Sequence, residues 1–301
     1  MVPRIDSLES RHLPSSVTGL QTATVQDLNG LLTSTSAVAS NDVWAVGGSL
    51  VEHFDGTSWN VVPTAPLPSG DFAQINGVVA LAHNDVWAVG TVSPPGGVGS
   101  SNTPLIEHFD GTTWSAVPGP PVSARSHRGL DAVSADAPND AWAVGSVGRG
   151  QNALGNELLH WNGAAWSVAT PPNVNVAGIT ALSPANVWAV GSSTSSSVAS
   201  IAHFDGTSWS VVASPAPASS ALNGIAAASA HDIWAVGQVG KATFTEHFDG
   251  TTWSVIASAN PTSAPVDSND LLAVTVSPDG GVVAVGSHTD ATGGHPLIVQ
   301  K

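Results

Sequence analysis

The stretch DVWAVGGSLVEHFDGTSW at residues 42–59 contains the two signatures that decide the fold of this chain. The first, WAVG, recurs at intervals of 43 to 55 residues, and a sixth copy reads VAVG at residues 283–286. The second, HFDGTSW or a close variant, follows each full copy. A repeat of this length indicates one supersecondary unit used several times. The tryptophans of the first signature are Trp44, Trp87, Trp142, Trp188 and Trp234, and those that end the second are Trp59, Trp114, Trp166, Trp209 and Trp253.

The fifth unit illustrates how each repeat is expected to fold. Asp249-Gly250 predicts a tight type I′ hairpin turn, because that turn needs positive φ at both central residues. Turn residues separate four strand-like segments in this unit, and this pattern predicts four antiparallel strands. Six such units predict an all-β, six-bladed propeller of four-stranded antiparallel blades. The four strands of this unit are expected in LNGIAAASA (222–230), IWAVGQV (233–239), TFTEHF (243–248) and TTWSVIAS (251–258).

The sixth unit lacks an outer strand, because the sequence ends with PLIVQK (296–301). We expect VTGLQTATV (17–25) to supply that strand and to complete the last blade. Such closure would join both ends of the chain in one sheet and remove an open edge. Residues 1–301 would then form a single domain, with residues 1–16 as an N-terminal extension.

The composition excludes several classes of partner. Seven basic residues against 22 acidic ones give a formal net charge of −15, which repels nucleic acid and anionic membrane surfaces. No apolar run approaches the roughly 18 residues that cross a bilayer, so we expect no membrane insertion. The N-terminus lacks the apolar core of a signal peptide. There is no cysteine, and the acidic, Ser/Thr-rich composition is typical of a secreted or cell-surface bacterial protein. We also expect a monomer without a cofactor.

Several motifs give the chain a resemblance to kelch-repeat propellers. They are WAVGG (44–48), the polar turn after the third strand, the Trp of the fourth strand, and SARSHRGL (123–130). The double glycine occurs at Gly47-Gly48, and Phe or Trp161 stands where kelch repeats have Tyr. The resemblance covers nearly the whole chain and implies the fold but no single activity, since the family includes protein-binding adaptors and an oxidase. The Tyr and Cys that the oxidase needs for its copper cofactor are absent. Asp-Gly-Thr-Ser/Thr-Trp is also similar to the Asp-box hairpin of sialidase-type propellers, with a spacing one residue shorter.

The repeated aromatic residues and histidines are interpreted as structural. All eleven Trp occupy repeat positions, so we expect them to pack between blades. The open alternative is a glycan site repeated at each blade junction. Five histidines share one third-strand position, and these positions lie too far apart around a propeller to share one metal ion. We expect each to bond the Asp or Asn two residues later. They are His53, His108, His160, His203 and His247.

Function is expected where the repeats differ. Strand direction places the loops between second and third strands, and the linkers from each blade to the next, on one face, which we call the loop face. The remaining turns lie on the opposite turn face. Blade 2 has a long loop at 91–104 and blade 3 another at 146–156, and three of the seven basic residues converge on blade 3. The candidate ligand-binding residues on the loop face are Asp71, Phe72, Gln74, Arg125, His127, Arg128, Arg149 and Lys241.

Two interpretations of the basic residues remain open. Arg pairs well with carboxylates, so the cluster could bind an anion or an acidic peptide. Alternatively, Arg125 and Arg128 brace a loop by pairing with Asp131 or Asp136. Calcium at the Asp-rich turns is a further alternative, although no EF-hand spacing is present. His288, Asp290 and His295 could form a metal or acid–base cluster, or belong to a solvated loop.

These observations favour a non-catalytic binding module that recognises a protein or carbohydrate ligand through the loop face. No GxSxG, HExxH or P-loop motif supports a catalytic centre. The alternative is an enzyme, a lyase or hydrolase, with its site in a central pocket. A purely structural surface repeat protein is the third hypothesis, which the unequal loops of blades 2 and 3 disfavour.

Overall fold

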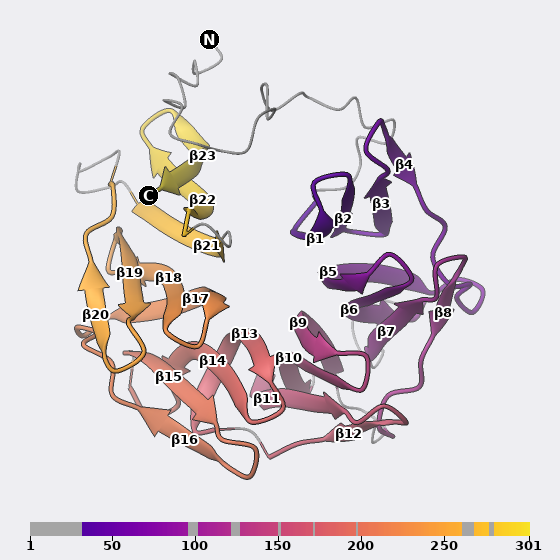
Figure 1. The fold of residues 1–301 in the computed structure, drawn as a ribbon, viewed down its shortest axis with the longest axis horizontal. Coiled ribbons are helices and arrows are strands. Elements are labelled where there is room, and N and C mark those ends of the chain that lie inside the picture. Colours follow the sequence, from indigo (N-terminus) through magenta and orange to yellow (C-terminus); the bar gives the residue numbers. More distant parts are fainter. Residues whose placement is uncertain are drawn as a thin grey trace.

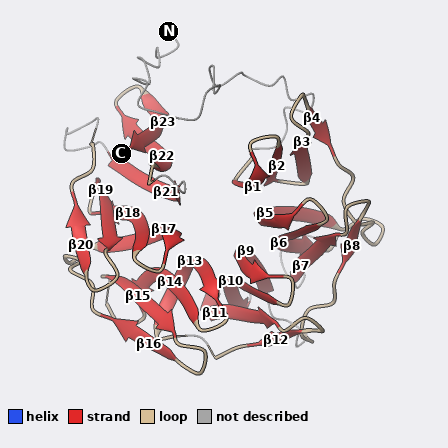
Figure 2. Cartoon of the chain, in the orientation of Figure 1, coloured by secondary structure: helices blue, strands red, loops and turns tan. Residues whose placement is uncertain are grey.

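The computed structural model confirms the predicted all-β, six-bladed propeller. Six antiparallel sheets surround one axis, and every regular element of the described residues is a strand (Figures 1 and 2). Within this part of the chain, nothing forms a helix that could cross a membrane. The described residues are 32–95, 102–121, 127–149, 152–170, 172–196, 198–260, 268–276 and 280–301.

Each blade is a meander in which consecutive strands are neighbours, running from the axis outward. Blade 1 contains β1 (Ser34–Ala39), β2 (Asp42–Gly47), β3 (Leu50–Phe54) and β4 (Trp59–Val61). Blade 2 contains β5 (Phe72–Ala82), β6 (Asp85–Ser93), β7 (Thr103–Phe109) and β8 (Trp114–Ala116). Blade 3 contains β9 (His127–Ala137), β10 (Asp140–Arg149), β11 (Asn152–Trp161) and β12 (Trp166–Val168).

The remaining blades continue the same order. Blade 4 contains β13 (Val174–Ser183), β14 (Asn186–Ser193), β15 (Ala199–Phe204) and β16 (Trp209–Val212). Blade 5 contains β17 (Ser220–Ser229), β18 (Asp232–Val239), β19 (Ala242–Phe248) and β20 (Trp253–Ile256). The described strands of blade 6 are β21 (Ser268–Val276), β22 (Val282–Asp290) and β23 (Gly293–Gln300). The predicted closing strand 17–25 and the extension 1–16 lie outside the described residues.

Most of the tryptophans pack between blades, as predicted. The ring of Trp44 in blade 1 lies 4.8 Å from Phe109 and 5.5 Å from Trp114 in blade 2, measured between ring centroids. Blades 2 to 4 repeat this contact with the next blade. Such edge-to-face pairs contribute about 0.5–1.5 kcal/mol beyond the burial of the rings themselves. The five Trp of the WAVG signature are 1–5% exposed, so none of them offers a platform for a sugar.

The glycine of WAVG allows two backbones to approach closely. In blade 2 the register shifts between Ile75 and Gly77, which marks a bulge opposite Gly90. A Cβ atom on Gly90 would lie 1.9 Å from the carbonyl oxygen of Gln74. The equivalent distance is 1.8 Å at Gly191 and 2.1 Å at Gly237. The signature therefore ends in glycine because the bulged inner strand leaves no room for a side chain.

The predicted two-residue Asp-Gly turns were wrong, because the loops contain four residues. Phe54 pairs with Trp59, so residues 55–58 form the loop, and Gly56 alone has a positive φ there, of 92°. The Asp55 carboxylate accepts the backbone N–H groups of Thr57 and Ser58, each at 2.9 Å. The hydroxyl of Thr57, which donates to the same carboxylate at 2.6 Å, lowers the pKa of Asp55, and the two backbone bonds lower it further. The side chain thus stabilises a longer loop than the dipeptide alone predicts.

The predicted partner of the repeated histidine was also wrong. Nε2 of His53 lies 2.8 Å from Oδ1 of Asp42, at the start of β2, and no such contact joins it to Asp55. The pair recurs in the next four blades with either Asp or Asn. The bond therefore links the third strand to the beginning of the second across the sheet, and the His ring also lies 4.3 Å from Trp44.

Candidate functional site

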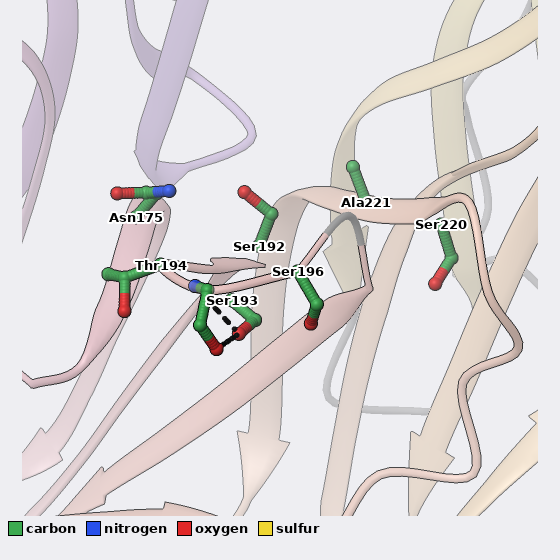
Figure 3. A pocket seen from close by; sticks show the side chains of 8 residues that line it. Asn175, Ser192, Ser193, Thr194, Ser196, Ser220 and Ala221 are labelled. Carbon is green, nitrogen blue, oxygen red and sulfur yellow. Dashed lines mark hydrogen bonds between the residues drawn. The ribbon is translucent and has the colours of Figure 1, made fainter.

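A pocket on the loop face, between blades 4 and 5, is the strongest candidate site. It has a volume of about 480 Å³. Figure 3 shows Asn175 and Thr194 on one side of it and Ser220 and Ala221 on the other. Ser and Thr hydroxyl groups dominate its lining, and none of the eight lining residues is charged. We call it the hydroxyl pocket, and its lining residues are Asn175, Ser192, Ser193, Thr194, Ser195, Ser196, Ser220 and Ala221.

Short local bonds shape the loop that carries most of these hydroxyls. The backbone N–H of Ser193 donates to the carbonyl of Val198 at 2.8 Å, which closes the loop after β14. Ser193 Oγ accepts the backbone N–H of Ser195 at 3.3 Å and lies 3.2 Å from its Oγ (Figure 3). The side chains of Ser192 and Thr194 bond no other described protein group. Their hydroxyls are therefore available to a ligand.

The opposite wall of the pocket is held by Ser220, at the start of β17. Its hydroxyl donates to the carbonyl of Pro217 at 2.5 Å and accepts the backbone N–H of Ala199 at 2.9 Å. The preceding Ser219 has φ 61°, a left-handed conformation that costs a non-glycine residue free energy. Its carbonyl accepts the backbone N–H of Gly240 at 2.7 Å. Strained backbone thus lies directly beside this wall.

Arg128 is engaged inside the protein, which supports the bracing alternative for this residue. Its Nε donates to Oε2 of Glu157, and its Nη2 pairs with Oε1 of the same carboxylate. The two side chains are 11% and 2% exposed. For Arg128 the proposed partners Asp131 and Asp136 were wrong, because Glu157 comes from β11, which is separated from β9 by β10 in the same sheet. A bidentate pair of this kind leaves little of the guanidinium for an external anion.

The other predicted residues of blades 2 and 3 are only partly brought together. Asp71, Phe72 and Gln74 lie at the start of β5, and the Phe72 side chain is 70% exposed. Nε2 of Gln74 donates to Oδ1 of Asn76 at 3.2 Å. Arg125 falls outside the described residues. His127 begins β9 and Arg149 ends β10, but their side chains are not among those described.

Lys241 lies far from the rest of the predicted set. It belongs to the turn between β18 and β19 of blade 5, on the opposite side of the ring from β5 (Figure 1). Its carbonyl accepts the backbone N–H of Asn269 at 2.9 Å and its side-chain Nδ2 at 3.2 Å. Blades 2 and 5 are three blades apart in a ring of six, so the predicted order of blades already implied this separation, and the candidate set should not have combined Lys241 with residues of blade 2.

Two segments that were predicted as loops are formed largely by paired strands. Strand β10 pairs with β11 up to Arg149 and Asn152, so the segment 146–156 is not the long loop that we expected. In blade 6, His288 pairs with His295 across β22 and β23, with ring centroids 5.1 Å apart. His295 Nε2 lies 3.3 Å from Oδ1 of Asp290. The solvated loop predicted there is therefore a strand pair.

The sequence reasoning missed the hydroxyl pocket, although a signal was present. The run SSTSSS at 192–197 is the densest group of hydroxyl residues in the chain and follows the fourth WAVG copy. We expected function in loops that are long or carry basic residues, whereas this loop is short and neutral. Asn175 and Ser220 come from other strands, so only the folded structure brings them to the run.

Comparisons with known proteins establish the fold. No family model matches the sequence, and no curated protein matches it. The chain is similar in structure to the fucose-recognising lectin of Aleuria aurantia, with 15% identity, coverage of 90% of this chain and 95% of the lectin, and a TM-score of 0.55. It is also similar to YCF48 from Cyanidioschyzon merolae (15% identity, 88% and 80% coverage, TM-score 0.54). The Hadza microbial sialidase Hz136 matches with 11% identity, 85% and 63% coverage, and a TM-score of 0.59. At such identities the likeness concerns the arrangement of strands, and folds of this kind carry many functions.

Proposed function

We propose that this chain is a non-catalytic binding protein that takes a neutral saccharide into the hydroxyl pocket. The observation that carries this proposal is the lining itself, which consists of six hydroxyl side chains, one amide and one methyl group. Every Ser or Thr hydroxyl can donate one hydrogen bond and accept others, and each sugar hydroxyl has the same capacity. A ligand rich in hydroxyls is therefore the best match to this surface.

The absence of charge among the lining residues narrows the ligand class. An acidic sugar or a phosphorylated ligand would lack a cation to pair with here, and the protein carries a formal net charge of −15. The pocket volume of about 480 Å³ lies within the range of about 300–1,000 Å³ that is usual for small-molecule sites. Both observations favour a small uncharged glycan.

The same lining argues against hydrolysis at this pocket. Glycoside hydrolysis generally needs two carboxyl groups about 5–9.5 Å apart, one acting as an acid. None of the eight lining residues is Asp, Glu or His. The lining can hold and orient a ligand, but it provides no group that could transfer a proton at neutral pH.

The structural neighbours add limited support. One protein of the same fold is a lectin that recognises fucose, which demonstrates that a six-bladed propeller can serve carbohydrate binding. The kelch-like repeat type, the extracellular or cell-surface location and the monomeric state stay predictions from the sequence.

A protein ligand is the second candidate, favoured by Phe72. This ring is 70% exposed at the beginning of β5, on the loop face. Exposed aromatic residues are common anchors of protein interfaces. A single aromatic ring supports a smaller contact than the hydroxyl pocket, so we rank this candidate second.

A glycan array tests the proposal, followed by titration of the best ligand into variants. We expect binding of neutral glycans over acidic ones. Ser192→Ala and Thr194→Val should each weaken affinity about fivefold, since one hydrogen bond contributes about 1 kcal/mol. Thr207→Val is the matched control, because Thr207 is exposed on the turn face of the same blade.

The outcomes separate the candidates. Binding that both pocket variants weaken and the control leaves unchanged supports the hydroxyl pocket. Failure to bind any glycan, or binding that the pocket variants do not alter, overturns it. If Phe72→Ala then abolishes capture of a defined protein ligand, the second candidate replaces the first.

A further inference from the structure

A cluster on the turn face, between blades 1 and 2, combines one carboxylate with two imidazoles. Asp42 begins β2, His53 lies in β3, and His83 belongs to the turn between β5 and β6 of the next blade. Nε2 of His53 is 2.8 Å from Oδ1 of Asp42, and Nδ1 of His83 is 3.2 Å from Oδ2. The three prospective ligand atoms lie within 4.8 Å of one another.

The other blades show which part of this cluster is structural. The contact between Asp and His in blade 1 recurs in blades 2 to 5, with Asn in place of Asp in blade 4. It therefore belongs to the repeat, where its role is to link two strands. The third residue does not recur in the other turns of this kind that the structure describes. The positions equivalent to His83 in the turns of blades 1, 3, 4 and 5 are Ser40, Pro138, Pro184 and Ala230. His83 is therefore an addition to the structural pair at one junction.

Two of the three groups are held in place before any ion arrives. The side chains of Asp42 and His53 are 13% and 14% exposed, and the ring of His53 stacks on Trp44 at 4.3 Å. The side chain of His83 is 67% exposed, so solvent reaches the cluster from its side. A fixed pair with a third, accessible ligand suits an ion that enters from water and keeps one water ligand.

The donor set identifies the class of ion. Two imidazole nitrogens and one carboxylate oxygen are ligands of zinc, which binds three protein groups and a water in open sites. Magnesium and calcium prefer oxygen ligands throughout, so two imidazoles disfavour them. The formal net charge of −15 attracts any divalent cation toward the surface.

We propose that Asp42, His53 and His83 form a Zn²⁺ site that joins blade 1 to blade 2 on the turn face. The site is independent of the hydroxyl pocket, which opens on the loop face. A bound ion would replace the hydrogen bonds that now connect the carboxylate to both rings, and it would cross-link two blades that otherwise meet through their tryptophans. The consequence is that zinc stabilises the folded chain.

Calorimetric titration of the metal-free full chain with ZnCl₂ at pH 7.5 tests the site. We expect one equivalent of Zn²⁺ to bind and to raise the melting temperature. Co²⁺ in its place should give the visible absorption bands of a four-coordinate site. His83→Ala should weaken Zn²⁺ binding by at least about tenfold, because it removes one of three protein ligands. His231→Ala is the control, since it removes an exposed turn histidine from blade 5 and leaves the cluster intact.

A variant that adds a second site tests the proposal without relying on the loss of a residue, which could destabilise the fold. Pro138→His places an imidazole at the position equivalent to His83, beside the existing pair of Asp85 and His108. We expect the stoichiometry to rise from one Zn²⁺ to two. Zinc binding that is equal in wild type and His83→Ala, or no binding in wild type at micromolar protein, overturns the proposal. A loss with His83→Ala but not with His231→Ala supports it, whatever the result of the glycan experiments.

Discussion

Equivalent tryptophans have different partners at two junctions, the one between blades 4 and 5 and the one between blades 5 and 6. Trp188 of blade 4 packs against Phe248 and Trp253 of blade 5, at centroid distances of 4.9 and 5.7 Å. Trp234 of blade 5 occupies the equivalent position, but the group over its ring is the ammonium of Lys301, 4.6 Å from the centroid. Lys301 occupies the position of Phe248 in the sixth copy of the repeat.

The burial of the second strands shows the same contrast. In blades 2, 4 and 5 these strands have five consecutive buried residues, because a neighbouring blade covers each face. In β22 of blade 6, buried and exposed residues alternate at the start of the strand. Val283 and Val285 are 37% and 42% exposed, and Ile298 of β23 is 56% exposed. Within the described residues, one face of the sixth blade thus lacks the cover that blades 2, 4 and 5 have.

A repeat can therefore keep its pattern of strands while the packing of its side chains changes. VAVG still forms a second strand and still places Gly286 against the carbonyl of Asp270. Val283 lacks the indole of the other five copies, yet the pairing of the second strand with the first is kept. Strand formation and blade packing therefore depend on different residues of one signature.

The largest expected effect concerns the completion of blade 6. From the sequence we propose that residues 17–25 supply its outer strand, so removing residues 1–25 should lower the melting temperature and the cooperativity of unfolding more than any point variant below. The reason is that β23 would keep an unpaired edge. Calorimetry and hydrogen exchange at β23 would measure this. Removal of residues 1–16 alone is the control and should have little effect, and equal stability of the two truncated chains would contradict the assignment.

The next effect separates the two junctions directly. Trp188→Ala should cost about 3–5 kcal/mol of unfolding free energy, as for a buried aromatic residue in a core. Trp234→Ala should cost less, because its ring has a cation over it in place of two aromatic partners. Guanidinium denaturation measures both variants. If both variants lose the same unfolding free energy, the contacts of Trp188 with two aromatic rings contribute nothing beyond burial.

A buried carboxylate offers a smaller, pH-dependent test in blade 5. Glu246 is 0% exposed, and its Oε1 accepts a hydrogen bond from Ser214 in the linker after blade 4 at 2.8 Å. Burial raises the pKa of Glu246 to about 7. The folded state therefore binds more protons than the unfolded state between about pH 4.5 and 7, and stability falls as pH rises through that window.

Glu246→Gln removes this titration. We expect the variant to be more stable than wild type at pH 8, by roughly 1–3 kcal/mol, and to lose that advantage near pH 4.5. Thermal unfolding across this pH range measures the difference. Blade 3 already has an uncharged residue, Leu159, at the equivalent position. A constant difference between variant and wild type at all pH values would refute the raised pKa.

The smallest effect concerns the cation over Trp234. Lys301→Met keeps the length of the side chain and removes its charge, and we expect a loss of about 0.5–1 kcal/mol. A double-mutant cycle with Trp234→Ala isolates the contact, because the loss should disappear when the ring is absent. If Lys301→Met is equally costly in both backgrounds, the ammonium does not interact with the indole.

Local patterns in the sequence predicted much of the fold and little of the site. The spacing of WAVG predicted the number of blades, and the repeat positions of the Trp residues predicted that most of them pack between blades, whereas the ring of Trp59 contacts Phe54 of its own blade. The partners predicted for His53 and Arg128 were wrong, because the actual partners, Asp42 and Glu157, come from other strands of the same blade, 11 and 29 residues away. It also overlooked the hydroxyl pocket, whose walls come from β13, the loop after β14, and β17.

By itself the sequence determined the strands, the blades and the residues that pack between them, because each depends on a short pattern that is repeated along the chain. Only the tertiary structure decided which polar groups meet. It joined Arg128 to Glu157 and brought His83 to a carboxylate of the preceding blade. The physical reason is that periodic hydrophobic burial acts within and between neighbouring repeats, whereas polar contacts need particular atoms at hydrogen-bonding distance.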